Sequence, residues 1–218
     1  AGGSQRIFYE LKDFLYLDAK SVNGTTLGEE IKNSAKWTQN IITNKSNPVF
    51  NAGSIAVLKG TLAPNSAIIK QSAATESLLI HEGRAVVFEG LEDLANRIDR
   101  DDLDVTKDDV LVLKSIGPKG GPGMPEAGLI PIPKKLAKQG VKDMVRISDG
   151  RMSGTASGTI ILHVTPESYE NGPLAIVENG DLIKLDVPKR KIDLMISEEE
   201  IAERLLKRKK VNMRRRGY

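Results

Sequence analysis

Hydroxyl side chains and glycines alternate in one short stretch, ISDGRMSGTASGTIILH, at residues 147–163. Ser153, Thr155 and Ser157 stand at alternate positions, and the small residues between them would let a substrate approach the backbone closely. Arg151 could bind a carboxylate or phosphate through two parallel N–H bonds. No His or Cys adjoins Ser153, so the sequence does not indicate an ordinary Ser–His–Asp site. These residues predict a site for an anionic substrate.

A second stretch, GPKGGPGMPE at 117–126, holds four glycines and three prolines. The backbone N–H groups of such a turn can cradle an anion. It ends in neither the Gly-Lys-Ser/Thr of a P-loop nor the glycine spacing of a dinucleotide site. Glu126 at its end could give one oxygen ligand to Mg²⁺, with other ligands elsewhere, or could be a surface acid near a helix start. Together the two stretches predict an anion or sugar-acid site.

The remaining reactive side chains favour structural roles. His163 lies in an apolar strand and is predicted to be a buried core histidine, while His81 lies at a turn. The chain of 218 residues has no cysteine, which excludes disulfides and any thiolate-held zinc or iron–sulfur centre within it. We found no apolar run of about 20 residues and no signal-like start, so a cytoplasmic protein without a membrane segment is expected.

The positive charge is concentrated at one end. Residues 206–216 contain four Arg and three Lys, although the net charge of the whole chain is only +3. This segment is either a solvated helix end or a contact for a nucleic acid or another subunit. The absence of an aromatic platform beside it argues against nucleic acid.

Helical patterns come first along the chain. Residues 5–16 and 25–34 predict two short helices, the second with Thr25 or Thr26 as its N-cap. A loop at 44–54, rich in Asn, Ser, Pro and Gly, predicts a boundary. Three later helices are predicted at 90–99, 131–140 (ended by Gly140) and 197–210 (begun by Ser197).

Short strands dominate after this boundary. The Asn179–Gly180 pair predicts a hairpin between two of them. About nine strands favour a β-rich α/β fold built on a barrel or folded sheet, flanked by helices, over a doubly wound nucleotide fold. The predicted strand runs are SIAVLKG, SAIIK, RAVVFE, DVLVLKS, DMVRIS, GTIILHV, LAIVENG, LIKLDV and KIDLMIS.

The pairing of GPKGGPGMPE with SDGRMSG at 148–154 resembles the dihydroxy-acid and 6-phosphogluconate dehydratase family, which includes aldonic-acid dehydratases. GTLAPNSAIIKQSA (60–73), GRAVVFE (83–89) and NGPLAIVENGD (171–181) resemble the C-terminal part of the family in the same order. The resemblance covers almost the whole chain. It implies a helical segment at 1–45 that ends an N-terminal domain, a swivelling β-barrel domain at 46–197, and a C-terminal helix and basic tail at 198–218.

The resemblance also implies roles for single residues. Ser153 matches the serine proposed as the base that removes the C2 proton of a 2,3-dihydroxy acid, and Thr155 matches a position at the substrate. Glu126 matches the Mg²⁺ ligand that this domain contributes. Arg151 and Gly154 fall in the substrate-binding motif.

Lys70 and Ser72, in IKQSA, either line the same pocket or form a turn at a strand end. The resemblance implies that the iron–sulfur cluster and the other Mg²⁺ ligands belong to the N-terminal domain, which is this chain's expected partner. It also implies a homo-oligomer.

The predicted reaction is a dehydration that yields a 2-keto acid. Met152 and SGTASGT resemble the sugar-acid members, whereas Gly150 resembles the branched-chain members. A pentonate or hexonate such as arabinonate or xylonate is therefore favoured over dihydroxyisovalerate. The alternative is a freestanding module that binds an anion or sugar acid without catalysis.

Overall fold

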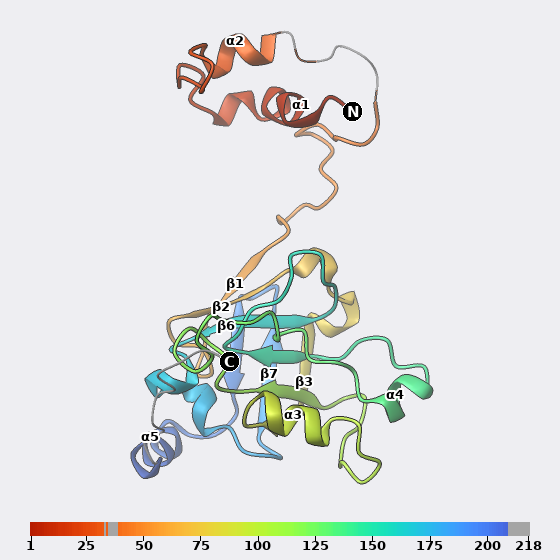
Figure 1. Cartoon of the computed structure of the whole chain (residues 1–218), viewed down its shortest axis with the longest axis vertical. Helices are drawn as coiled ribbons and strands as arrows, with labels where there is room; N and C mark the ends of the chain where they lie inside the picture. Colours follow the sequence, from red (N-terminus) through yellow and green to blue (C-terminus); the bar gives the residue numbers. More distant parts are fainter. Residues whose placement is uncertain (33, 35–38, 209–218) are drawn as a thin grey trace. The chain divides into compact units, whose positions relative to one another are not determined.

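The computed structural model describes residues 1–32, 34 and 39–208 of the chain. It forms two compact units, residues 1–52 and 53–218, which are described separately (Figure 1). The predicted basic segment lies mostly outside the described residues, because only its first part, up to Arg208, is included. Within the described residues, no helix is both long enough and apolar enough to cross a membrane.

The first unit is helical. It contains α1 (Gly3–Glu10), the short 3₁₀ helix η1 (Lys12–Phe14) and α2 (Leu27–Lys32). Thr26 and Glu29 form a capping box at α2: the Glu29 N–H donates to Thr26 Oγ1 and the Thr26 N–H to Glu29 Oε2. The helix predicted at 25–34 is confirmed, with Thr26 in the capping position, whereas the one predicted at 5–16 ends at Glu10 and is followed by η1.

The second unit is built on one eight-stranded sheet with the strand order β1-β2-β6-β5-β4-β3-β7-β8. The four central strands, from β6 to β3, run parallel, while the flanking pairs are antiparallel. The strands are β1 (Ala56–Leu58), β2 (Ser66–Ile69), β3 (Ile80–Phe88), β4 (Val110–Leu113), β5 (Arg146–Ser148), β6 (Ile160–Thr165), β7 (Leu182–Asp186) and β8 (Lys191–Leu194).

The sheet curls until its two edges meet. The Lys59 N–H donates to Arg190 O at 3.0 Å and the Ile192 N–H to Lys59 O at 3.2 Å, which joins the end of β1 to β8. The interior of this nearly closed barrel is filled by Val, Ile, Leu and Ala side chains from all eight strands and from the segment at 174–177. The predicted β-rich α/β fold with a barrel-like sheet is confirmed.

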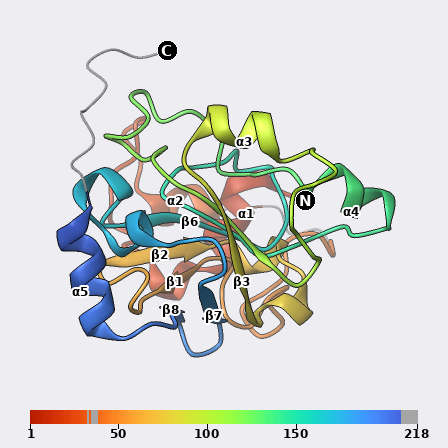
Figure 2. The ribbon, with the colours of Figure 1, turned by 90° about the horizontal axis from the view of Figure 1, so that it is seen from below.

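Helices cover the outside of the barrel (Figure 2). The outer core packs α3 (Leu91–Arg97) and α4 (Lys134–Lys138) against the outward side chains of β3 and β4. α5 (Glu198–Lys207) begins at Ser197, whose Oγ accepts the Glu200 N–H at 3.1 Å. All three predicted helices are confirmed, as is the left-handed Gly140 (φ 89°) after α4.

The predicted strand at LAIVENG is wrong. Residues 173–176 form a buried 3₁₀ helix, η5 (Pro173–Ile176), so Asn179–Gly180 does not join two paired strands. Instead, Asn179 Oδ1 accepts the Val87 N–H at 2.7 Å and the Gly180 N–H donates to Ala85 O at 2.9 Å. The hairpin pattern failed because an apolar run predicts burial equally well for a strand and for a short turn.

Candidate active site

The two glycine-rich loops leave neighbouring parallel strands. β4 pairs with β5 in parallel, with Leu113 beside Ser148, so the segments that follow start side by side at the carboxyl end of the sheet. Ligand sites of parallel sheets commonly lie at this end. The first loop carries Glu126, and the second, which runs from 149 to 159, carries Ser153.

An ion pair joins the two loops. Arg151 Nη1 lies 2.8 Å from Glu126 Oε1, and Arg151 Nε donates to Met124 O at 2.7 Å. The Gly128 N–H donates to Arg151 O at 2.7 Å, and a Cβ at Gly128 would lie only 2.8 Å from that oxygen. The side chains of Glu126 and Arg151 stay 48% and 43% exposed, so both remain accessible. The structure thus brings the predicted metal ligand and the predicted substrate-binding arginine together.

Ser153 and Thr155 form a pair of hydroxyls. Their side-chain oxygens are 3.0 Å apart, and the Thr155 N–H points at Ser153 Oγ at the longer distance of 3.5 Å. The loop between them is open to solvent, and a Cβ on Gly154 would meet no atom within 4 Å. Two donors of Thr155 can therefore face the oxygen of Ser153, on a surface that a substrate can reach.

Lys70 also reaches this loop. Its Nζ donates to Gly154 O at 2.8 Å, so a second cation, in addition to Arg151, contacts the loop that carries Ser153. Lys70 lies where β2 ends and the short 3₁₀ helix η2 (Gln71–Ala73) begins. Ser72 is exposed within that turn, and its N–H donates to Ser54 O at 3.4 Å. A role for Ser72 at the substrate stays a prediction.

The end of the second loop is fixed to the barrel by Asp143. Its carboxylate accepts the N–H and Oγ1–H of Thr159, the hydroxyl of Thr75, and Nη2–H of the buried Arg146 at 2.7 Å. Burial alone would raise the pKa of Asp143, but the hydrogen bonds from Thr75 and Thr159 and the charge of Arg146 outweigh it and lower the pKa. A Cβ on Gly158 would lie 2.0 Å from Arg146 Nη2, so only glycine fits there.

The start of the second loop is fixed by Asp149. This carboxylate is buried and accepts three backbone N–H groups: Ile116 at 3.0 Å, Ser115 at 3.3 Å and Ser168 at 2.9 Å. It thereby joins the segments that follow β4, β5 and β6. One signal in the sequence indicates this role, namely an acid directly after an apolar strand.

The glycine turn of the first loop does hold an anion, but the anion belongs to the protein. Glu167 accepts the Lys119 N–H at 2.8 Å and the Gly120 N–H at 3.3 Å. A Cβ on Gly117 would lie 2.2 Å from Glu167 Oε2, so this glycine makes room for the carboxylate. The predicted anion cradle is therefore occupied by Glu167, which was not among the predicted site residues. Nothing in the sequence links Glu167 to this turn.

His163 is not the buried core histidine that was predicted. It is half-buried, has a left-handed backbone (φ 53°), and lies where the pairing of β2 with β6 shifts register. It borders a cavity of about 480 Å³ together with Lys119 and Glu167. Burial, and then the positive charge of Arg151, lower the pKa of His163. His81 Nε2 lies 2.9 Å from Asp108 O.

The described residues supply few ligands for a metal ion by themselves. They contain no group of three or more His, Cys, Asp or Glu side chains arranged to hold one. Glu126 is a half-exposed carboxylate and can supply one oxygen to Mg²⁺, which needs several more ligands. An iron–sulfur cluster does not fit this chain, because the sequence has no cysteine.

Comparisons with known proteins place these loops in context. A model of the dihydroxy-acid/6-phosphogluconate dehydratase C-terminal family matches residues 40–218. The chain is 51% identical over 205 residues to a putative dehydratase of Rhizobium meliloti and 47% identical over 207 residues to an L-arabinonate dehydratase of Rhizobium leguminosarum. It is 42% identical over 207 residues to a dihydroxy-acid dehydratase of Carboxydothermus hydrogenoformans.

These alignments cover 94% of the chain but only 36% to 37% of each relative. The chain therefore spans little more than a third of the length of these relatives.

Proposed function

The chain belongs to the dihydroxy-acid/6-phosphogluconate dehydratase family, in its C-terminal part, and from this premise we propose that it carries the proton-abstracting half of a dehydratase active site. The complete protein would remove water from a 2,3-dihydroxy acid and release a 2-keto acid. The observation that carries the proposal is the Ser153–Thr155 pair at 3.0 Å on an open loop that also carries Arg151 and accepts a hydrogen bond from Lys70.

Ser153 is the proposed base. A serine hydroxyl has too high a pKa to act as a base at neutral pH unless its alkoxide is stabilised. Thr155 can donate both its hydroxyl and its N–H to Ser153 Oγ, and Lys70 and Arg151 add positive charge to the same loop. Hydrogen bonds and charges that favour the ionised form lower the pKa of the group that they surround. Ser153 would then take the C2 proton of the substrate.

Arg151 is the proposed anchor of the substrate. Its guanidinium is half exposed and is held by Glu126 and Met124 O, so one face remains available to a carboxylate. Lys70 is bonded to Gly154 O and would keep the loop in place while Gly154 leaves space for the substrate.

Glu126 is the proposed contribution of this chain to a Mg²⁺ site. Bound Mg²⁺ would supply a positive charge that stabilises the negative charge developing on the substrate carboxylate. The remaining ligands, and any cysteines for an iron–sulfur cluster, would come from the part of the protein outside this chain. That part is the proposed partner of the open loop surface, and a homo-oligomer remains a prediction.

The proposed substrate class is the sugar acids. Two of the relatives reported above are an L-arabinonate dehydratase and a dihydroxy-acid dehydratase, and identity is higher to the first, 47% against 42%. We therefore favour an aldonate such as arabinonate over dihydroxyisovalerate as the substrate.

The test is Ser153→Ala in the complete protein, with kcat measured on arabinonate, xylonate and dihydroxyisovalerate. The loss of a general base should lower kcat by about 10²–10⁴-fold without changing the urea midpoint of unfolding. Thr155→Val should lower kcat less, and Thr155→Ser, which keeps the hydroxyl, should recover most of it. Full activity of Ser153→Ala would refute the mechanism, and binding of the sugar acid without turnover by the unchanged protein would support the module without catalysis.

A further inference from the structure

A second cleft lies at the same end of the sheet but shares no residue with the loops of Ser153 and Glu126. It has a volume of about 460 Å³, within the usual range for small-molecule sites. Glu89 and Lys114 stand in it directly after the parallel strands β3 and β4, where ligands of parallel sheets commonly bind. Segment 175–179 and the end of α5 complete the wall.

The floor of this cleft carries a buried ammonium group. The side chain of Lys114 is only 5% exposed, and Nζ donates to Glu89 Oε1 at 2.7 Å. An ammonium has three N–H groups, and the described residues give this one a single carboxylate acceptor. A buried cation with unfilled donors favours a further acceptor.

The cations at the rim differ in how far they are neutralised. The charge of Arg204 is neutralised, since it donates to Asp181 at 2.6 and 3.2 Å and to Glu200 at 2.6 Å, and the Asp181 carboxylate raises its pKa. Arg208 instead donates to neutral acceptors, Ser168 O at 2.6 Å and Asn171 Oδ1 at 2.9 Å. No carboxylate among the described residues forms an ion pair with it, so its charge is available to an anion.

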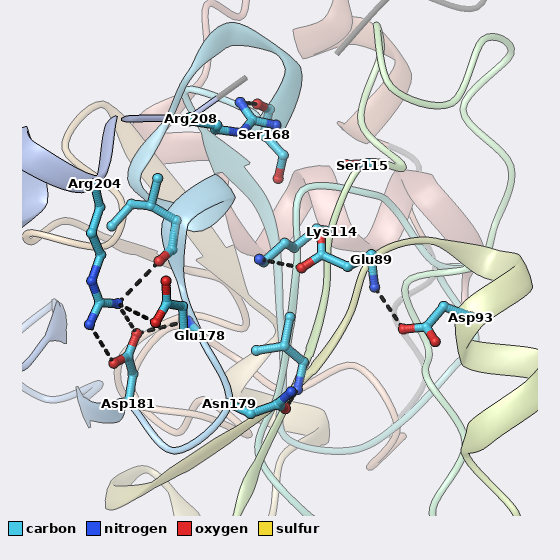
Figure 3. A network of polar contacts seen from close by, with 12 residues as sticks. Glu89, Asp93, Lys114, Ser115, Ser168, Glu178, Asn179, Asp181, Arg204 and Arg208 are labelled. Atoms are coloured by element: carbon cyan, nitrogen blue, oxygen red, sulfur yellow. Dashed lines mark hydrogen bonds and ion pairs between the residues drawn. The ribbon is translucent and has the colours of Figure 1, made fainter. Parts of the chain in front are cut away.

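Figure 3 shows the arrangement, with Lys114 and Glu89 on one side of the view and the Arg204–Asp181 group on the other. Beside Arg208 lies Ser168, whose buried Oγ has no hydrogen-bond partner among the described residues. Buried hydroxyls without a partner are rare in folded proteins.

Acidic groups also line the cleft but lie at its mouth. The side chains of Glu89 and Glu178 are 67% and 70% exposed, so solvent screens them more than it screens the buried Lys114. Lys207 also lines the cleft, paired with Glu203, as does Asn179, and the apolar part of the lining comes from Val87 and the segment 175–177. The unfilled donors of the buried Lys114 beside an apolar wall suit an organic anion.

We propose that this cleft binds the phosphate group of a small phosphomonoester, with Lys114 and Arg208 as the charged contacts and the apolar wall beside its organic part. A phosphate carries two charges near neutral pH and pairs well with two cations.

The test measures binding to the chain by isothermal titration calorimetry with two probes, inorganic phosphate and phenyl phosphate. Arg208→Gln and Lys114→Met should each weaken phenyl phosphate about tenfold or more, because each removes a charge-assisted hydrogen bond. Glu89→Gln should tighten binding, because it removes the carboxylate that competes for Lys114. Lys142→Met, which removes one positive charge from an exposed position outside the cleft, should change nothing.

A gain of affinity in Glu89→Gln cannot arise from misfolding, so the test does not depend on the stability of Lys114→Met. The absence of saturable heat with both probes would overturn the proposal. So would weakening by Lys142→Met equal to that by Arg208→Gln, which would indicate unspecific attraction. Tighter binding of inorganic phosphate than of phenyl phosphate would overturn the proposal of a phosphomonoester and identify free phosphate as the ligand.

Discussion

The two glycine-rich loops have similar compositions, but their polar groups find different hydrogen-bond partners. In the first, the N–H groups of Lys119 and Gly120 are filled by Glu167, a carboxylate from another part of the chain. In the second, Asp149 and Asp143 fix the two ends, while the side chains of Ser153 and Thr155 in the middle bond to each other. Glycine content alone thus does not distinguish a scaffold turn from a reactive loop.

The difference lies in where the polar groups find partners. Polar groups whose hydrogen bonds are completed within the protein cost free energy to disturb, and they have few donors or acceptors left for a ligand. Groups on the exposed middle of a loop can exchange water for substrate. Changes at the scaffold residues should therefore alter stability, and changes at Ser153 should alter turnover alone.

Asp149→Ala should have the largest effect on stability. It leaves three backbone N–H groups without their acceptor, two of them in the turn that leads into the first loop. The loss should be about 3 kcal/mol or more of the free energy of unfolding, measured by urea denaturation. Asp102→Ala, which breaks an exposed ion pair with Arg100, should leave the midpoint unchanged. Equal midpoints for Asp149→Ala and the unchanged chain would contradict the scaffold role.

Glu167→Gln should have a smaller effect, about 1 kcal/mol, because an amide oxygen can still accept one N–H of the glycine turn. The same substitution at Glu170, whose exposed carboxylate pairs with Lys119, should be close to neutral. Comparing the two variants by urea denaturation isolates the stability that the hydrogen bonds from the glycine turn to Glu167 contribute. If Glu170→Gln cost as much as Glu167→Gln, the turn would not depend on the internal anion.

The smallest effect should be a pH dependence from His163. Its pKa is lowered in the folded chain, so between its ordinary value near 6.5 and the lower folded value the unfolded chain binds more protons. Stability should therefore fall as pH decreases below about 6.5. Asparagine tolerates the left-handed backbone. His163→Asn should therefore reduce the slope of stability against pH, measured as urea midpoints from pH 7.5 to 5.

His81→Asn, the same change at the chain's other histidine, should leave the slope in place. A slope that persists in His163→Asn would assign the pH dependence to other groups.

The sequence by itself determined the local structure. Runs of Val, Ile and Leu located eight strands, and Thr26, Ser197 and Gly140 marked helix ends, because capping and alternation act between near neighbours. The motifs with Glu126 and Ser153 also selected the two loops that the ion pair of Arg151 joins.

Only the tertiary structure decided how the loops are used. Glu167 lies 47 positions from Gly120 and Asp149 lies 33 from Ile116, so these contacts exist only after parallel pairing aligns the ends of β4, β5 and β6. Residues 173–176 form a 3₁₀ helix and not a strand, and the barrel interior buries the apolar residues 174–177 in this geometry. Sequence patterns report burial and local geometry, whereas a partner for a buried charge is set by distances that only the folded chain defines.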